Sequence, residues 1–176
     1  MQSLKELSLK YDTDKSTAHN YTHIYETYLS NFKNKRIKLL EIGIGGYSSS
    51  SDGGGSLKMW RDYFKKGKIA GLDIEDKFLK FGKRVHIFKG SQESTKDLSK
   101  IIKLFKNFDF IIDDGSHLNN HQIRTFEILF PYLKNGGFYF IEDIQTSYML
   151  KYGGDGFYLN NRKSAINYFK SLIDKI

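Results

Sequence analysis

Two apolar segments of this sequence end in acidic residues. The segment FDFIIDDGS ends with Asp113 and Asp114, and the segment GGFYFIEDI ends with Glu142 and Asp143. Neighbouring strands lie about 4.8 Å apart, so these carboxylates converge at one edge if the two segments are paired strands. Like charges held close together disfavour ionisation, and a divalent cation would relieve that conflict. Oxygen ligands in a chain without cysteine indicate Mg²⁺ or a similar hard ion.

His117 follows Asp114 closely enough to reach the same edge. A histidine beside such an ion can accept the proton of a hydroxyl group, which predicts a general base. Two other interpretations stay open, a loop histidine bonded to a carboxylate and acids that cap the following helices. Successive strand residues point to opposite faces, so Asp114 is the expected ligand, while Asp113 supports the loop or faces a cofactor.

Strands alternating with helices would position these residues. Five apolar runs predict strands at 37–44, 69–75, 84–91, 108–116 and 136–144. Amphipathic patterns predict helices at 55–67, 94–107, 119–137 and 161–176. Asn135-Gly136-Gly137 reads as a turn that introduces the last strand, and Pro131 is expected to bend or end the helix before it. The alternation predicts an α/β fold with a parallel sheet.

Residues 1–36 differ from the rest of the chain. They are predicted to form a helical cap rich in tyrosine and histidine. Residues 37–176 are predicted to form the ligand-binding domain. In an open parallel sheet, ligands bind beyond the carboxyl ends of the strands, which is where the acids lie.

The composition narrows the class of protein. The chain has 176 residues, of which 39% are hydrophobic, and no cysteine. These values predict one globular domain without disulfides or thiolate metal sites. No apolar run approaches transmembrane length, and no signal-peptide pattern is visible, so a cytoplasmic location is expected. The net charge of +8 comes from scattered lysines, which favours a solvated surface over a nucleic-acid interface.

The end of the first predicted strand carries a glycine turn. Glu41 precedes Gly43 and Gly45, and Ser48 stands where a dinucleotide fingerprint would place its third glycine. The E-x-G-x-G pattern, together with Asp73 at the end of the next strand, favours S-adenosylmethionine (SAM) over NAD. An acid at Asp73 is placed to accept hydrogen bonds from ribose hydroxyls. The alternative interpretation is that these glycines form an ordinary strand-to-helix turn without a ligand.

Several longer strings resemble one enzyme family. LLEIGIGGYSS, GGGSLKMWRDYF, GLDIEDK, IDDGSHLNNHQIRTFEILFPYLKNGG and FIEDIQTSY are similar to sugar O-methyltransferases of macrolide and polyketide pathways, over nearly the whole chain. The resemblance implies a Rossmann-like class I methyltransferase fold with strand order 3-2-1-4-5, and Mg²⁺ and SAM as cofactors. It implies that Asp114, Glu142 and Asp143 bind the metal and that His117 is the base. It places Glu41, Gly43, Gly45, Ser48 and Asp73 at SAM, with Ser91 and Gln92 near the adenine. It also implies that Tyr21 and His23 of the cap close over the cofactor or the sugar.

The chain departs from that family in its number of strands. The fold normally has seven strands and only five are found, so strands 6 and 7 are expected to be missing from a truncated chain. The last strand would then be an apolar edge, which predicts self-association into a homo-oligomer. The expected substrate is a small glycoside or a saccharide. A non-catalytic SAM-binding remnant is the main alternative, and an RNA methyltransferase is a weaker one.

Overall fold

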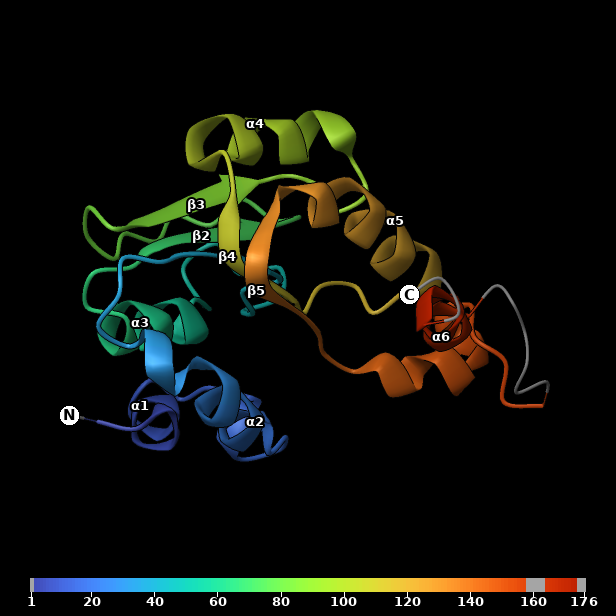
Figure 1. Ribbon diagram of the computed structural model, residues 1–176, viewed down its shortest axis with the longest axis horizontal. Helices are drawn as coiled ribbons and strands as arrows, with labels where there is room; N and C mark the ends of the chain where they lie inside the picture. The colour runs from blue at the N-terminus through green and yellow to red at the C-terminus, as the bar shows by residue number, and fades with distance from the viewer. Residues whose placement is uncertain (1, 158–163, 174–176) are drawn as a thin grey trace.

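A five-stranded parallel sheet forms the centre of the computed structural model, which describes residues 2–157 and 164–173 (Figure 1). The strands lie in the order β3-β2-β1-β4-β5, which confirms the order that the family resemblance implied. Their bounds are β1 Lys38–Ile42, β2 Lys68–Asp73, β3 Val85–Lys89, β4 Phe108–Asp113 and β5 Leu133–Ile141. The carboxyl ends of β1 and β4 are therefore adjacent, and they meet at the middle of the sheet.

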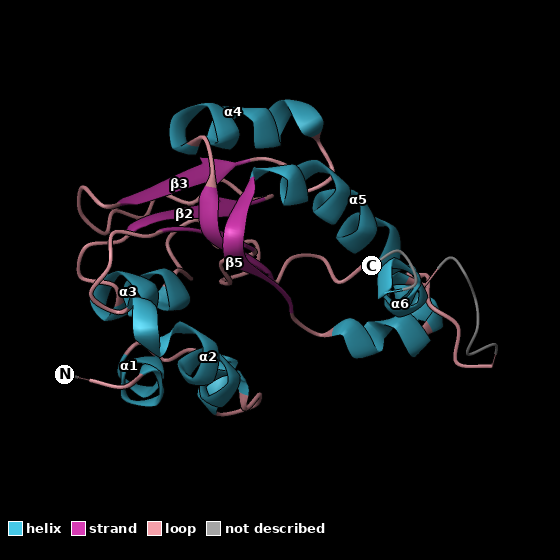
Figure 2. Cartoon of the chain, in the orientation of Figure 1, coloured by secondary structure: helices cyan, strands magenta, loops and turns pink. Residues whose placement is uncertain are grey.

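Helices cover both faces of the sheet, which gives three layers (Figures 1 and 2). One face carries α1 (Leu4–Lys10), α2 (Tyr21–Leu29) and α3 (Gly55–Tyr63). The other carries α4 (Thr95–Phe105) and α5 (Asn119–Leu129), and α6 (Ala165–Ile173) packs beside α5. Within the described residues, the longest and most apolar helices still fall short of a membrane span.

Side-chain alternation along the strands divides the apolar core into two parts. Leu39 of β1 packs with Trp60 of α3, together with residues of α1 and α2. Its neighbour Leu40 packs on the opposite face, with Leu98 and Phe105 of α4. The N-terminal helices thus share a core with the sheet. This packing holds the segment between α1 and α2 against the sheet.

The last strand begins earlier than the sequence indicated. β5 starts at Leu133, and the Asn135-Gly136-Gly137 segment lies inside it as an irregularity instead of a turn before it. The register passes from Leu133 opposite Phe108 to Phe138 opposite Phe110, so β5 uses extra residues there. A glycine at positive φ makes such a bulge possible, and Gly136 has a φ of +75°. The prediction that 135–137 is a turn before the strand was therefore wrong.

The helix predicted at 119–137 is shorter than expected. α5 ends at Leu129, and a 3₁₀ turn at Phe130–Tyr132 contains Pro131, so the predicted effect of the proline is confirmed. The sequence pattern predicted the position of the helix correctly, but its predicted end at residue 137 lies beyond the observed end at Leu129.

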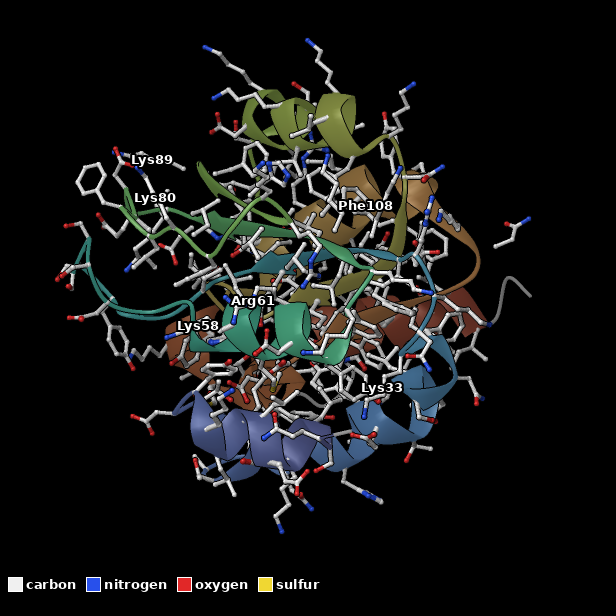
Figure 3. The ribbon with its side chains drawn as sticks, turned by 90° about the vertical axis from the view of Figure 1, so that its left-hand side faces the viewer. Lys33, Lys58, Arg61, Lys80, Lys89 and Phe108 are labelled. Carbon is white, nitrogen blue, oxygen red and sulfur yellow. The ribbon has the colours of Figure 1, made fainter. Side chains whose placement is uncertain are left out.

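The basic residues are spread over several elements. Figure 3 labels Lys33, Lys58, Lys80 and Lys89, which project from separate segments of the chain. This distribution agrees with the expectation of a solvated basic surface without one concentrated stripe.

Candidate active site at the carboxyl edge of the sheet

An open cavity of about 760 Å³ lies beyond the carboxyl ends of the strands. Its wall is formed by the loops that follow β1, β2, β3 and β4 and by the N-terminal segment around Lys15. Eight of the predicted site residues line it: Gly43, Gly45, Ser48, Asp73, Ser91, Gln92, Asp114 and His117. The topology therefore brings together residues that are distant in the sequence.

The glycine turn after β1 needs glycine for two reasons. Gly43 has a φ of +77°, and a Cβ atom there would collide with the backbone carbonyl of Asp114. Gly45 has a φ of +71°, with open space around the position of a Cβ atom. Both residues adopt the left-handed region that glycine tolerates at no steric cost. The turn keeps the β1 and β4 ends close while its backbone faces the cavity.

Asp73 is already oriented by the backbone around it. One carboxylate oxygen accepts a hydrogen bond from the amide of Ile44 at 3.1 Å, and the other accepts one from the amide of Glu75 at 2.9 Å. An ionised carboxylate has about four acceptor positions, so two remain for ligand hydroxyls. The position of Asp73 on the cavity wall is compatible with the ribose-binding role that the sequence predicted.

Asp113 lies behind the cavity wall. Its side chain is buried and accepts hydrogen bonds from Gln92 Nε2 at 3.1 Å and from the amide of Gly115 at 3.3 Å. Burial raises the pKa of Asp113 to about 7. These contacts match the loop-supporting role expected as one of two possibilities, while a place for Asp113 on the cofactor side stays a prediction. Gln92 does line the cavity, but its amide group also holds the β4 loop.

Glu41 is buried at the end of β1. One carboxylate oxygen accepts a hydrogen bond from Ser56 at 2.7 Å, while Oε1 has no hydrogen-bond partner. The Nζ atom of Lys15 lies 3.4 Å from Oε1. Burial raises the pKa of Glu41, while the nearby ammonium opposes that shift. Glu41 is not on the cavity wall, so its predicted contact with SAM would require an intermediary.

Asp114, His117 and Asp143 form a cluster at the cavity edge. Each offers one donor atom, and these atoms lie within 4.8 Å of one another. His117 Nε2 lies 3.7 Å from Asp143 Oδ2, while His117 Nδ1 is buried without a hydrogen-bond partner. His117 and Asp143 both have positive φ values, of 58° and 52°. Such backbone angles are uncommon outside glycine and are often found at functional sites.

Asp143 is held by two other side chains. The hydroxyl of Tyr21 donates to Oδ1 at 2.8 Å, and Gln145 Nε2 donates to the same oxygen at 3.0 Å. Burial alone would raise the pKa of Asp143, but the hydrogen bonds from Gln145 and Tyr21 outweigh it and lower the pKa. Asp143 is therefore an ionised and oriented carboxylate. Of the two cap residues singled out in the sequence, Tyr21 reaches the site and His23 is exposed.

Glu142 lies next to this cluster, because it shares the ammonium of Lys15 with Asp114. Its Oε1 accepts hydrogen bonds from Lys15 Nζ at 2.7 Å and from the hydroxyl of Tyr25. Burial raises the pKa of Glu142 to about 7, against the opposing effect of Lys15. The group whose donor atoms lie within 4.8 Å of one another contains Asp114, Asp143 and His117, without Glu142. That Asp114, Glu142 and Asp143 bind the metal stays a prediction.

Sequence reasoning missed Lys15 altogether. The residue is 1% exposed and pairs with carboxylates far along the chain, Asp114 at 2.6 Å and Glu142 at 2.7 Å. Burial alone would lower the pKa of Lys15, but the surrounding carboxylates raise it well above its ordinary value. A lysine between polar residues in DTDKST carries no local signal. The only sequence signal for it was the excess of acidic residues at the strand ends, which indicated that a cation lies nearby.

The cluster fits a hard divalent cation. Two carboxylates at a cavity edge, with an imidazole beside them, offer oxygen and nitrogen donors to such an ion. The unpartnered Nδ1 of His117 and the partly exposed carboxylate of Asp114 leave donor capacity unused within the protein. Asp114 and Asp143 are therefore the residues best placed to hold an ion.

The architecture and the position of the cavity define the class of protein. Strand order 3-2-1-4-5 with helices on both faces, and a cavity at the carboxyl edge, is a Rossmann-like α/β arrangement for binding a nucleotide-type ligand. No family profile matches the chain.

Relatives with curated functions narrow this class. The chain is 40% identical to 8-demethyl-8-(2-methoxy-alpha-L-rhamnosyl)-tetracenomycin-C 3'-O-methyltransferase of Streptomyces olivaceus, over 98% of the chain and 45% of the relative. It is 40% identical to mycinamicin VI 2''-O-methyltransferase of Micromonospora griseorubida, over 98% and 44%. The chain spans a little under half the length of these relatives. Over that span it is homologous to sugar O-methyltransferases, which confirms the resemblance seen in its motifs.

Solved structures agree with this relationship. MycE methyltransferase from the mycinamycin biosynthetic pathway, in complex with Mg and SAH, matches with a TM-score of 0.93 at 39% identity. The match covers 98% of this chain and 45% of that chain. A second structure of MycE, in complex with Mg, SAH and mycinamycin VI, gives the same score over 48% of its chain. The Rossmann-like class I methyltransferase fold predicted for the chain is confirmed.

Proposed function

We propose that this chain forms the SAM-binding and metal-binding part of a sugar O-methyltransferase. The observation that carries the proposal is the convergence of Asp114, His117 and Asp143 at the edge of a cavity whose wall also holds the Gly43 turn and Asp73. The relatives named above methylate sugars, and MycE was solved with Mg and SAH, which is the product of SAM after methyl transfer. The expected cofactors are accordingly SAM and Mg²⁺.

The cofactor would occupy the side of the cavity nearest β1 and β2. The backbone of the Gly43–Gly45 turn allows close approach, and the free acceptor positions of Asp73 suit ribose hydroxyls. Ser48, Ser91 and Gln92 add polar groups along the same wall. Glu41 supports this wall from behind through Ser56, the first turn of α3, and does not need to touch the cofactor.

The sugar hydroxyl would lie between the cofactor methyl group and His117. A divalent ion held by Asp114 and Asp143 would stabilise negative charge on the sugar oxygen as a Lewis acid. His117 would accept the hydroxyl proton at Nε2, the ring nitrogen on the side of Asp143. Asp143 would stabilise the resulting imidazolium. The oxygen would then bond to the methyl carbon as the bond from sulfur to that carbon breaks, with SAH as the leaving group.

His117 has a second possible role as a metal ligand, because it belongs to the cluster that could hold an ion. We favour the base because Asp143 lies 3.7 Å from Nε2, where its negative charge would stabilise the imidazolium formed by proton transfer. Glu142 could still contribute its second oxygen to the ion. A cytoplasmic location and a homo-oligomeric state stay predictions.

Calorimetric titration with SAM, with and without Mg²⁺, tests the binding half of this proposal on the intact chain. Methyl transfer from labelled SAM to rhamnosylated acceptors tests the catalytic half. A folded sample that binds no SAM would contradict the proposal. SAM binding without transfer to any glycoside would instead favour a SAM-binding module that is not catalytic by itself. Asp114→Ala should abolish transfer, with Asp52→Ala, an exposed aspartate, as the matched control.

A further inference from the structure

The amino edge of the sheet, opposite the cavity, gathers basic residues from separate parts of the chain. All strands of a parallel sheet start at one edge, so the segments that lead into them become neighbours. Lys38 and Lys68 begin β1 and β2 and lie opposite each other in the register. Lys106 lies between α4 and β4, and Lys134 is the second residue of β5. These four amino-edge lysines form a local concentration of charge within a basic surface that is otherwise spread out.

Asp109 is the carboxylate that lies among the amino-edge lysines, and its acceptor positions are largely used. Both of its oxygens accept from Lys134 Nζ at 2.8 Å, and Oδ2 also accepts from the backbone amide of Lys38 at 2.7 Å. Partial burial and the charges of the other three amino-edge lysines lower the pKa of Lys38, against the opposing effect of Asp109. Positive charge is therefore in excess at this edge, which suits an anionic partner.

Exposed apolar side chains border the basic edge at the C-terminal ends of α4 and α5. Leu104, in the last turn of α4, is 48% exposed, and Phe130, directly after α5, is 50% exposed. Tyr132, two residues before Lys134, is 38% exposed. The two helices contact each other on the same face of the sheet (Figure 1). Cations beside apolar side chains that project into solvent are typical of surfaces that bind anionic membranes.

A groove between α4 and α5 joins the two kinds of residue. It has a volume of about 470 Å³, and Ile102, Ile128 and Pro131 form its apolar part. Lys103 and Arg124 line the same groove, so cations stand beside aliphatic walls. A phospholipid offers both a phosphate and an apolar chain to such a surface. A nucleic acid would use the cations alone, because isoleucine and proline give bases no aromatic ring on which to stack.

We propose that the amino edge of the sheet, together with the C-terminal ends of α4 and α5, docks on a membrane surface of anionic phospholipids. The lysines approach the lipid phosphates, and Leu104 and Phe130 enter the boundary between headgroups and acyl chains. The cavity lies at the opposite, carboxyl edge, so the docked chain keeps it open to solvent. This inference goes beyond the proposed function and does not depend on it, because vesicle binding needs neither SAM nor a sugar.

Sedimentation of the chain with vesicles tests the role of the lysines. Mixed vesicles of phosphatidylcholine and phosphatidylglycerol are the probe, and vesicles of phosphatidylcholine alone are the reference. The wild type should bind the mixed vesicles at low salt and leave them as the ionic strength rises. Lys103→Gln/Lys106→Gln should lower the partition coefficient about 25-fold, since each lysine near an anionic surface contributes about fivefold.

A second pair of lysines provides the matched control. Lys80→Gln/Lys89→Gln removes the same charge elsewhere on the molecule. Figure 3 labels both residues on the side away from Phe108, the first residue of β4, and therefore away from the amino edge. This double variant should bind the mixed vesicles nearly as well as the wild type does. The thermal midpoint of each variant shows whether it is folded.

Leu104→Gln tests whether apolar side chains enter the membrane. The variant keeps every lysine, so a loss of binding reports the apolar contact. Its partition coefficient should fall about tenfold, the lower end of what burial of a leucine side chain contributes. Leu9→Gln is the control, because Leu9 is 56% exposed on α1, and it should bind as the wild type does.

Several results would overturn the inference. One is a folded wild-type chain that does not sediment with the mixed vesicles. Another is an equal loss in both lysine pairs, because net charge would then explain the binding without this edge. Equal binding by Leu104→Gln and Leu9→Gln would show that no apolar contact forms. Binding to a DNA duplex without binding to vesicles would assign the edge to a nucleic acid. A chain that binds vesicles but no SAM would contradict the proposed function alone.

Discussion

The hydroxyl of Tyr21 donates a 2.8 Å hydrogen bond to Oδ1 of Asp143, which lies 122 residues further along the chain. The amide of Asp143 donates in return to the tyrosine oxygen at 3.3 Å. One side chain of α2 therefore orients both the backbone and the carboxylate of a candidate ligand. Burial raises the pKa of Tyr21 to about 12, so the hydroxyl remains a donor at neutral pH.

Tyr21→Phe should weaken metal binding without unfolding the chain. The ring that stacks on His19 is retained, and only the hydroxyl that orients Asp143 is lost. Groups that orient metal ligands typically contribute about 10- to 100-fold in affinity, so a Mn²⁺ titration should show a loss of that size. Tyr28→Phe is the control, since Tyr28 lies on the same helix and is half exposed. Equal Mn²⁺ affinity in Tyr21→Phe and wild type would show that the Tyr21 hydroxyl is not needed to orient a metal ligand.

His117→Gln separates the two roles open to this histidine. Loss of a general base should lower the rate of methyl transfer by about 10²- to 10⁴-fold, while Mn²⁺ affinity stays close to the wild-type value. A metal ligand should behave differently, because its removal would reduce Mn²⁺ affinity by about tenfold or more. Parallel measurement of transfer rate and Mn²⁺ affinity decides between them. His23→Gln, an exposed histidine of the N-terminal helices, serves as the control.

Local sequence patterns were sufficient for most of the fold. Apolar runs and helical periodicity placed all five strands, and the wall of the cavity followed from where those strands end. The error at the start of β5 has a physical reason. Asn135-Gly136-Gly137 has the composition of a turn, but a bulge also needs a residue at positive φ, and the sequence alone does not distinguish the two.

The division among the acids could not be read from the sequence. The alternation rule correctly separated Asp113 from Asp114, because neighbouring residues of one strand take opposite sides. It said nothing about Glu142, whose Oε1 accepts a hydrogen bond from Lys15, a contact across 127 positions of the chain. Such a contact depends on how the N-terminal segment packs on the sheet, and no local periodicity reports that.

Gly43→Ala should lower the free energy of unfolding by more than the strain of a non-glycine residue at positive φ explains. Gly43 and Gly82 have similar φ values, of +77° and +86°, but only at Gly43 would a Cβ atom meet a backbone carbonyl, that of Asp114. Gly82→Ala is the matched control and should cost about 1–2 kcal/mol in the free energy of unfolding from strain at positive φ. Gly43→Ala should cost clearly more in urea unfolding and should reduce SAM affinity. Similar losses for both variants would show that β1 and β4 can separate without damage to the site.

The N-terminal segment that carries Lys15 is anchored near a second acid, Asp62 of α3. The hydroxyl of Tyr11 donates to Oδ2 of Asp62, and Arg61 Nε donates to Oδ1 at 2.8 Å. Arg61 is among the residues labelled in Figure 3, on the helix that faces α1. The hydrogen bonds from Arg61 and Tyr11 lower the pKa of Asp62 to about 2, against the opposing effect of burial.

Asp62→Asn should therefore lower stability in a pH-dependent way. The folded-state pKa of Asp62 is below its ordinary value of 3.8, so its contribution is present at higher pH and is lost as the pH falls towards about 2. The variant should lose about 1 kcal/mol of unfolding free energy near neutral pH, the usual size for one such hydrogen-bonded charge. Urea unfolding at about pH 7 and about pH 3 should show that the difference from wild type shrinks at the lower pH. Asp76→Asn, at an exposed site, should show little difference at either pH. A difference for Asp62→Asn that stays constant over this range would mean that its carboxylate charge does not hold the N-terminal segment in place.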